Sequence, residues 1–173
     1  MTQIRFGLFE TPLGVALLAA TPRGLCALRL CRSHGPQEQW AEVGLEFAGA
    51  EMMEDAAALR PYADQLVAFL DGRTDAFRPP LDILSGTAFQ RQVWAEVGRI
   101  PAGETISYTE LAARVSRPSA VRAVAGACAR NGLAVAIPCH RVRRHDGTLA
   151  GYRWGKEWKP RLLALEARMV RGG

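Results

Sequence analysis

The sequence has few cysteines and no long hydrophobic segment. Its 173 residues contain four Cys, which show neither paired C-x-x-C spacing nor the density of a disulfide scaffold. No run of about 18 or more apolar residues occurs, and the N-terminal stretch MTQIRFGLFETPLG lacks the basic and apolar regions of a signal peptide. These absences argue against a secreted, disulfide-rich protein and against a membrane-spanning one. They predict a cytoplasmic globular protein with reduced thiols.

Lysine is absent from the first half of the chain. Residues 1–86 carry 7 Arg, no Lys and 11 acidic residues, a net charge of −4, whereas residues 87–173 carry 15 Lys and Arg against 6 acidic residues, a net charge of +9. Positive charge gathered in one half is typical of a protein that binds phosphate groups, although a solvated basic face without a partner is the alternative. The C-terminal half is therefore the candidate for contact with a polyanion.

The first third of the sequence alternates apolar and polar residues in short runs. The segments Ile4–Glu10, Gly14–Thr21 and Gly24–Cys31 have this pattern and are separated by the turn sequences T-P-L-G and T-P-R-G. Because tight turns join antiparallel neighbours, the three segments predict an antiparallel sheet.

Helical spacing follows the predicted strands. Residues 37–47 and 55–70 carry apolar side chains at helical intervals, whereas the glycine and prolines between residues 71 and 85 predict a connection. The expected fold class is therefore α+β. We expect an N-terminal α/β lobe over residues 1–80 and a helical C-terminal lobe over residues 87–173.

The second half begins with three predicted helices. Capping boxes at Thr87 and Ser107 open helices over residues 87–99 and 107–115. A third helix is expected over residues 119–130, after a break that contains a proline. The last two helices form a helix-turn-helix pattern, which is found both in DNA-binding domains and in ordinary helical hairpins.

The third predicted helix is rich in alanine and glycine. Its sequence, SAVRAVAGACAR, offers Arg122 as the one long side chain in the first two turns. A helix that reads base sequence needs several long polar side chains, whereas small residues permit close approach to a groove wall. An Ala-rich core helix would leave Arg122 without a role. The composition therefore favours DNA binding with little sequence preference.

A cysteine and a histidine are adjacent in the segment that follows. The apolar run 133–137 leads into P-C-H-R-V at residues 138–142. A thiol must lose its proton to act as a nucleophile, and a neighbouring base or cation makes this possible at neutral pH. A lone Cys-His pair is more often a packing feature, but the rigid proline and the apolar run favour Cys139 as a nucleophile with His140 as its partner.

Several separated motifs resemble the O6-alkylguanine-DNA alkyltransferase family. They are I-P-C-H-R-V at residues 137–142, the helix-turn-helix with Tyr108 and Arg122, Asn131, and G-Y-R-W-G at residues 151–155. The resemblance runs from about Ile4 to Ala167 and is closest to the C-terminal methyltransferase domain of the bacterial adaptive-response protein Ada. It implies a ribonuclease-H-like N-terminal lobe and a C-terminal lobe that binds double-stranded DNA.

The resemblance also implies an irreversible, single-turnover repair reaction. Cys139 would accept the alkyl group from O6-methylguanine, and from O4-methylthymine, after the damaged base has flipped out of the duplex. His140 would act as a base through a water molecule, and Glu166 would orient the imidazole and stabilise its positive charge. Tyr108 would assist nucleotide rotation and donate a proton toward the guanine leaving group. No cofactor is implied.

Binding through the minor groove is a further implication. A monomer is expected, because one damaged base per molecule requires no more. Arg122 would fill the space left by the extruded base, the Arg153 backbone N–H would lie near O6, and Asn131 would brace the turn before the nucleophile. The implied DNA-binding residues are Tyr108, Ser119, Arg122, Ala123, Ala127 and Arg130, and the implied pocket residues are Asn131, Pro138, Val142, Gly151, Tyr152, Arg153 and Trp154.

The N-terminal half contains a spacing that could suggest zinc, formed by Cys26, Cys31 and His34. Three candidate ligands, two of them on a predicted strand, make a poor tetrahedral site, so we expect no metal. We also expect Cys26, Cys31 and Cys128 to be inert buried thiols. Arg141 fits either an internal ion pair or contact with DNA.

Three other functions fit parts of the sequence. A non-catalytic DNA-binding relative would carry Trp in place of the nucleophile, whereas Cys139 is present. A transcription factor is suggested by the helix-turn-helix, yet the sequence shows neither a second one nor an N-terminal cysteine cluster for phosphotriester repair. A Cys-His hydrolase would not need the basic half. Whether the chain is a free-standing enzyme or a domain of a bifunctional regulator stays open.

Overall fold

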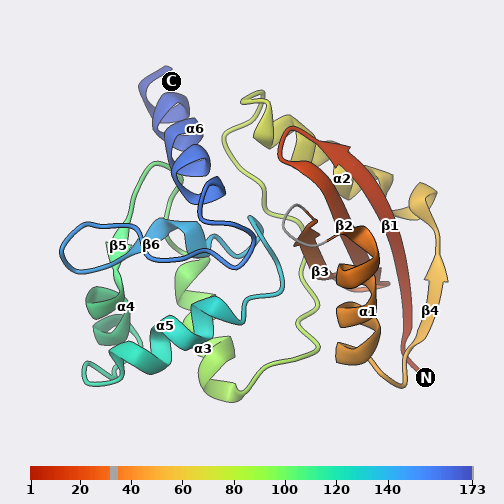
Figure 1. Ribbon diagram of the computed structural model, residues 1–173, viewed down its shortest axis with the longest axis horizontal. Coiled ribbons are helices and arrows are strands. Elements are labelled where there is room, and N and C mark those ends of the chain that lie inside the picture. Colours follow the sequence, from red (N-terminus) through yellow and green to blue (C-terminus); the bar gives the residue numbers. More distant parts are fainter. Residues whose placement is uncertain (32–34, 173) are drawn as a thin grey trace. The chain divides into compact units, whose positions relative to one another are not determined.

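A computed structural model describes residues 1–31 and 35–172 of the chain (Figure 1). The chain forms two compact units, Met1–Ser85 with Gly132–Ala134, and Gly86–Asn131 with Val135–Gly173. The short segment 132–134 thus belongs to the first unit although it lies between two parts of the second. Among the described residues, no helix is both long enough and apolar enough to cross a membrane.

The first unit contains a four-stranded sheet with the order β3-β2-β1-β4. The predicted antiparallel order of its first three strands is confirmed. A fourth strand was not predicted, and it makes the sheet mixed, because it pairs parallel to β1. Its sequence, EMME, is short and mostly exposed at the sheet edge, and its two apolar residues are adjacent, so it lacks the alternation that marks a strand. The strands are β1 (Gln3–Thr11), β2 (Gly14–Thr21), β3 (Gly24–Leu30) and β4 (Glu51–Glu54).

Two helices, α1 (Pro36–Glu46) and α2 (Ala56–Leu70), cover opposite faces of this sheet. Phe6 of β1 stacks on Trp40 of α1, with ring centroids 3.8 Å apart. The next residue of β1, Gly7, lies against the backbone of Ala56 in α2. Since successive strand residues point to opposite faces, each helix buries one apolar face of the sheet.

Strand β3 is buried along its whole length although it ends the strand order. Its outer edge is covered by two isolated bridges, one to Leu81 and one to Leu133. The Leu28 N–H donates to the Gly132 carbonyl, and the Ala134 N–H donates to the Leu28 carbonyl, both at 3.0 Å. These bonds tie the sheet to the segment that leads toward Cys139.

The second unit is mainly helical (Figure 1). The predicted helix after Thr87 is confirmed, with its complete capping box. Residues 115–120 join α4 to α5, and α5 begins two residues later than predicted because the Ala120 N–H closes a turn onto the Arg117 carbonyl. The elements are α3 (Ala88–Val97), β5 (Ile106–Ser107), α4 (Tyr108–Arg114), α5 (Val121–Ala129), the short 3-10 helix η1 (Cys139–Arg141), β6 (Val142–Arg143) and α6 (Trp158–Gly172).

Helix α5 presents one face to the core of the second unit. Val124, Ala127 and Cys128 are buried at helical spacing, and the Trp94 indole N–H of α3 donates to the Ala127 carbonyl at 2.8 Å. The inclusion of Ala127 among the DNA-binding residues is therefore corrected, because its side chain faces the core. Arg122 and Ala123, by contrast, are exposed.

Candidate active site

Cys139 is the first residue of η1 and is 4% exposed. The Asn131 side-chain amide donates to the Ile137 carbonyl at 2.8 Å and to Cys139 Sγ at 3.4 Å. One buried amide thus holds both the backbone of the loop and the sulfur. Val135, between them in the chain, adopts a positive φ of 66°, a strained conformation for a β-branched residue. The loop is therefore held in place by surrounding contacts rather than by local preference.

The Cys139 thiol lies in surroundings that disfavour its thiolate. A hydrogen bond with Cys128 and burial raise the pKa of Cys139 well above its usual value, while the Asn131 amide and the Lys159 ammonium oppose the increase. Cys139 is consequently protonated at neutral pH in the resting protein. Nucleophilic use of this sulfur requires a base.

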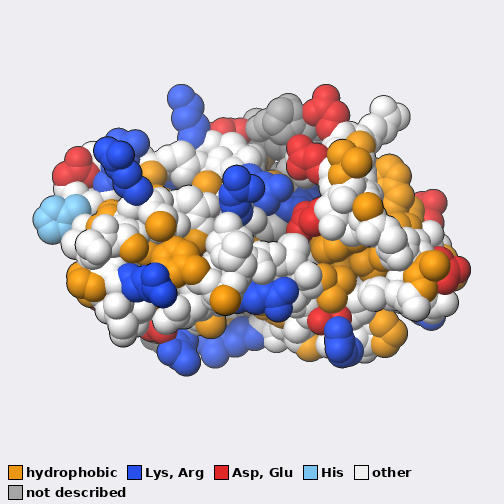
Figure 2. Space-filling model, turned by 90° about the horizontal axis from the view of Figure 1, so that it is seen from below, with side chains coloured by type: hydrophobic (Ala, Val, Ile, Leu, Met, Phe, Trp, Pro, Cys, Tyr) orange, Lys and Arg blue, Asp and Glu red, His pale blue; other side chains and the backbone are white. Residues whose placement is uncertain are grey.

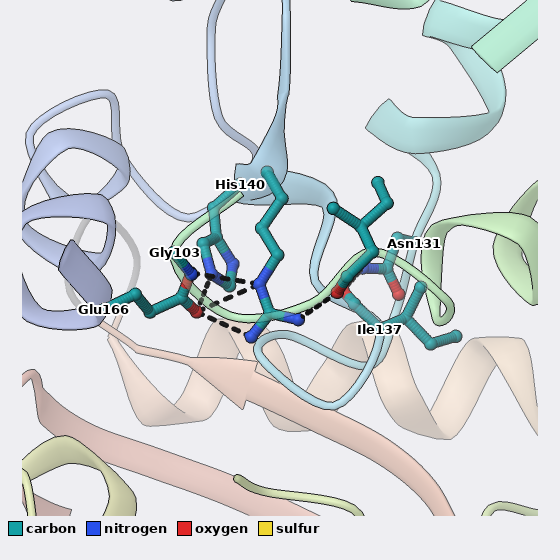
Figure 3. Close-up of polar contacts among 7 residues, drawn as sticks. Gly103, Asn131, Ile137, His140 and Glu166 are labelled. Carbon is teal, nitrogen blue, oxygen red and sulfur yellow. Dashed lines mark hydrogen bonds and ion pairs between the residues drawn. The ribbon is translucent and has the colours of Figure 1, made fainter. Parts of the chain in front are cut away.

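The neighbouring His140 is fully buried and faces Glu166 of α6 (Figure 3). His140 Nε2 lies 2.7 Å from Glu166 Oε1. Burial lowers the pKa of His140 despite the opposing effect of Glu166, so the imidazole is neutral at pH 7. A carboxylate can only accept, so Nε2 carries the proton and Nδ1 is the basic nitrogen. Nδ1 has no hydrogen-bond partner among the described residues.

Glu166 is held as a carboxylate by Arg141. The guanidinium donates to it through Nε at 3.0 and 3.1 Å and through Nη2 at 2.7 Å, while Nη1 donates to the Ile100 carbonyl at 2.6 Å. The Gly103 N–H adds a longer bond of 3.4 Å. Burial would raise the pKa of Glu166, but the hydrogen bonds from His140 and Arg141 outweigh it and lower the pKa to about 2. Of its two predicted alternatives, Arg141 adopts the internal ion pair.

A pocket of about 380 Å³ opens beside Cys139. Its volume lies within the range of small-molecule sites, about 300–1,000 Å³. Four predicted site residues besides Cys139 line it, namely Tyr108, Gly151, Tyr152 and Arg153. Six further lining residues were not predicted as site residues: Ala125, Cys128, Ala129, Arg144, Ala150 and Lys159.

Four predicted pocket residues do not line this pocket. Asn131, Pro138, Val142 and Trp154 are buried and absent from its wall. Asn131 instead supports the nucleophile loop through its amide. The Arg153 guanidinium, which lies 4.8 Å from the Trp154 ring, donates to the carbonyls of Arg130 and Asn131, both at 3.1 Å. Arg153 thereby ties the pocket wall to the C-terminal end of α5.

Lys159 is the most deeply buried of the six lining residues that the sequence did not predict. It lies in the first turn of α6 and is 1% exposed, which is rare for lysine. Lys159, Leu162 and Glu166 are spaced as i, i+3 and i+7, which places them on one helical face. This spacing was the available signal, because Leu162 marks that face as buried.

The exposed surface of the second unit is rich in cations. Figure 2 shows Lys and Arg side chains distributed over the visible part of this unit, among small apolar patches. Of the predicted DNA-binding residues, Tyr108 is half-buried in the pocket wall. Ser119, Arg122, Ala123 and Arg130 are exposed at α5 or at its ends.

The zinc ligands considered for the first unit cannot all be placed. Cys26 and Cys31 are buried, and burial raises the pKa of Cys26 to about 12. His34 lies outside the described residues. Within residues 1–31 and 35–172, no group of three His, Cys, Asp or Glu side chains is arranged to hold a metal ion.

Two family descriptions match successive parts of the chain. Residues 4–83 match "6-O-methylguanine DNA methyltransferase, ribonuclease-like domain", and residues 88–168 match "6-O-methylguanine DNA methyltransferase, DNA binding domain". Together the two matches cover most of the chain.

Known proteins resemble the chain over most of its length. The bifunctional transcriptional activator/DNA repair enzyme Ada of Escherichia coli is 44% identical over 164 residues, which cover 95% of this chain but 46% of Ada. The chain thus spans about half the length of that relative. The methylated-DNA–protein-cysteine methyltransferase of Mycolicibacterium paratuberculosis is 38% identical over 95% of this chain and 93% of its own.

Solved structures give the same relationship. The O6-methylguanine methyltransferase of Mycobacterium tuberculosis has a TM-score of 0.80 and 34% identity, over 98% of this chain and 94% of its own. The OGT protein of the same organism, solved in complex with DNA, has a TM-score of 0.77 and 33% identity over 96% and 94% of the two chains. The predicted resemblance is therefore confirmed, and the chain belongs to the O6-methylguanine-DNA methyltransferase family.

Proposed function

We propose that this chain repairs O6-alkylguanine in double-stranded DNA by moving the alkyl group irreversibly to Cys139. The observation that carries the proposal is the buried Cys139 thiol at the pocket, next to an imidazole whose proton-bearing nitrogen is engaged by Glu166 and whose other nitrogen is basic. A nucleophile, a base and an orienting carboxylate are the groups that such a transfer needs.

The proton and the alkyl group move in opposite directions in this reaction. The Cys139 proton passes to His140 Nδ1, through a bridging water, as the sulfur attacks the alkyl carbon. The S–C bond forms while the C–O6 bond breaks, and the guanine takes up a proton, for which the Tyr108 hydroxyl in the pocket wall is the candidate donor. Glu166, a carboxylate, stabilises the imidazolium. Water has no leaving group to displace from the resulting thioether, so each molecule reacts once.

DNA binding is assigned to the exposed face of α5. The side chains there are small apart from Arg122, which suits close approach to the minor groove without reading base edges. The pocket beside Cys139 accommodates a base only after it has left the stack, so we infer that Arg122 fills the vacated space. O4-methylthymine is included as a second substrate, and the protein acts as a monomer.

The two lobes predicted from the sequence take different parts in this proposal. Residues 87–173 carry the chemistry and the DNA contacts. Residues 1–80 support the segment ahead of the nucleophile through the bonds between Leu28 and residues 132–134. The cytoplasmic location stays a prediction.

Radiolabelled methylated DNA tests the proposal. Wild-type protein mixed with duplex that carries O6-[³H-methyl]guanine is expected to gain about one methyl group per molecule, located on the peptide that contains Cys139. Cys139→Ala is expected to gain none while it still binds the duplex. Cys26→Ala, a buried thiol of the other unit, is the matched control and should behave as wild type. Methyl transfer by Cys139→Ala, or many turnovers per molecule, would refute the mechanism.

A regulatory function is the second candidate, because the Ada relative is named a transcriptional activator. The affinity for undamaged DNA of different sequences distinguishes the repair function from the regulatory function. Repair predicts salt-sensitive binding that differs less than about tenfold between unrelated duplexes, whereas regulators prefer their sites by roughly 10³ or more. A preference of that size would give this chain a regulatory function of its own.

A further inference from the structure

Cys128 has no part in the proposed transfer, yet it shares a pocket with the nucleophile. The four cysteines of the chain are free and buried, and the two in the second unit, Cys128 and Cys139, both line this pocket. Cys128 belongs to the last turn of α5 and Cys139 begins η1, so two separate elements bring the thiols together. A thiol in a pocket wall is within reach of small molecules, unlike one sealed in a core.

Asn131 connects the two cysteines through two hydrogen bonds. Its backbone N–H donates to the Cys128 carbonyl at 3.2 Å, and its side-chain amide donates to Cys139 Sγ at 3.4 Å. The two thiols also form a hydrogen bond with each other, and both interact electrostatically with Tyr108 and with Lys159. Thiols that are hydrogen-bonded face each other, which is the arrangement that a disulfide requires.

The chemistry of the pocket makes this proximity consequential. The sulfur that attacks an alkyl carbon as a thiolate also attacks the oxygen of a peroxide, and the first product is a sulfenic acid. An isolated sulfenic acid is oxidised further to a sulfinic acid, which thiol reductants do not reverse. A second thiol in contact with the sulfenic acid converts it to a disulfide, which they do reverse.

We propose that Cys128 is a resolving thiol, which captures Cys139 as an intramolecular disulfide after a peroxide has oxidised it. A thiol reductant then returns both cysteines to the free state. The capture itself does not depend on repair, whereas its value as protection of the nucleophile rests on the proposed function.

The reaction has two steps. The Cys139 thiol gives up its proton to His140 and attacks one oxygen of hydrogen peroxide; the S–O bond forms as the O–O bond breaks, and the departing hydroxide takes that proton and leaves as water. Cys128 then attacks the sulfur of the sulfenic acid, so the S–S bond forms as the S–O bond breaks. The second hydroxide leaves as water with the Cys128 proton. The two thiols lose two electrons, and the peroxide gains them.

Peptide mapping without a reductant tests the proposal, with hydrogen peroxide as the probe. Trypsin cuts after Arg122, Arg130 and Arg141, so the two cysteines fall in the separate peptides 123–130 and 131–141. Wild type that is oxidised and then blocked with iodoacetamide is expected to yield these peptides joined by a disulfide, as the main oxidised form of Cys139. Dithiothreitol should separate them and restore methyl acceptance to at least about half of the untreated value.

The variant Cys128→Ala removes the capturing thiol. Its Cys139 should proceed to the sulfinic acid, so the methyl acceptance recovered with dithiothreitol, relative to the same variant untreated, should be about tenfold lower than in wild type. Cys128→Ser is a second variant, used if Cys128→Ala does not fold, and thermal unfolding checks each protein. Cys26→Ala removes a buried thiol of the first unit and should recover as wild type does.

Two results would overturn the proposal. One is wild-type Cys139 recovered as a sulfinic acid, or joined to a second protein molecule, instead of to peptide 123–130. The other is a folded Cys128→Ala protein that recovers methyl acceptance to the same extent as wild type.

Peptide mapping needs no DNA, so this inference and the proposed function can fail separately. Linked peptides in a protein that takes no methyl group from DNA would leave the capture of Cys139 standing and refute the repair function. Methyl transfer by a protein that forms no linked peptides with peroxide would do the reverse.

Discussion

Among the described residues, each unit contains an arginine–glutamate pair in which one partner is fully buried, and the two pairs are built in opposite ways. In the first unit the Arg29 side chain is fully buried, whereas that of Glu46 is 27% exposed and also accepts from the Ser85 hydroxyl at 2.6 Å. In the second unit the Glu166 side chain is fully buried, whereas that of Arg141 is 10% exposed. The residue types are the same, but the buried charge is positive in one pair and negative in the other.

The buried partner indicates what each pair does. The guanidinium of Arg29 packs against Gly132, in the segment that precedes the nucleophile loop. A buried cation there supports backbone packing and offers no site for a proton. The carboxylate of Glu166 contacts His140, the base that takes up a proton in the proposed transfer. The Arg29–Glu46 pair is therefore called the structural pair. The Arg141–Glu166 pair is called the functional pair, because its carboxylate contacts the base of the proposed reaction.

Glu166→Gln should have the largest effect, because it removes the negative charge from the functional pair. The imidazolium formed during transfer loses its stabilising partner, and Arg141 is left buried beside a neutral amide. We expect the rate of methyl transfer per folded molecule to fall about 10³-fold, within the range of general-base contributions, and the free energy of unfolding to fall by about 3 kcal/mol. Single-turnover transfer and urea unfolding measure the two effects. A rate within tenfold of wild type would show that His140 does not depend on Glu166.

Glu46→Gln is the matched change in the structural pair. It neutralises the carboxylate that the buried Arg29 guanidinium binds, but Glu46 is partly solvated, so the expected loss of unfolding free energy is smaller, about 2 kcal/mol. Methyl transfer per folded molecule should stay within about threefold of wild type, because the change touches no group of the pocket. A large loss of transfer rate in a folded Glu46→Gln protein would contradict the separation of the two pairs.

The sequence alone predicted some residues of the site and missed or left undecided others. The P-C-H-R-V run identified Cys139 and His140, because adjacent residues report their own chemistry. The same run left Arg141 undecided, since its partner Glu166 lies 25 residues away and a local pattern carries no information about distant contacts. Glu166 was inferred from family resemblance, and Lys159 was missed because lysine is expected at the surface.

The same limit applies to the fold. The three strands with apolar alternation and tight turns were predicted, whereas the short EMME strand was not, because its pairing with β1 depends on tertiary contact. The burial of Ala127 likewise depends on the packing of α5 against α3. Alanine suits both a core and a close approach to DNA, so composition alone could not decide between them.

Acid should reduce the contribution of Glu166 to the free energy of unfolding, and the loss should begin well above the pKa of Glu166 in the folded protein. The pKa of Glu166 is about 2 in the folded protein against an ordinary 4.5. The stabilisation is therefore complete above about pH 4.5 and is lost as the pH falls toward 2. By pH 3.5 the loss should be roughly 1.4 kcal/mol of a total of about 3 kcal/mol. Urea unfolding of wild type and Glu166→Gln between pH 6 and 3.5 measures this loss. The difference between their free energies of unfolding should become smaller as the pH falls. A constant difference would mean that Glu166 titrates normally.

Gly132→Ala should have the smallest effect and tests how closely the structural pair fits its segment. A Cβ at residue 132 would lie 2.6 Å from Arg29 Nη1, which is closer than real contacts allow. The guanidinium is fully buried and bound to Glu46, so it has little room to move. Overpacking of this kind costs about 1–3 kcal/mol, and the reduced entropy of the unfolded chain returns about 0.4–1 kcal/mol, which leaves a net loss of about 1 kcal/mol.

Gly151→Ala is the control for this change, because its Cβ would meet no atom within 4 Å. Without overpacking, the substitution only reduces the entropy of the unfolded chain, so the variant should be as stable as wild type or slightly more stable. Urea unfolding of both variants gives the comparison. If Gly132→Ala were as stable as Gly151→Ala, the Arg29 guanidinium would have to move freely beneath the segment. Residues 132–134 would then be held by their backbone hydrogen bonds to Leu28 rather than by the Arg29–Glu46 pair.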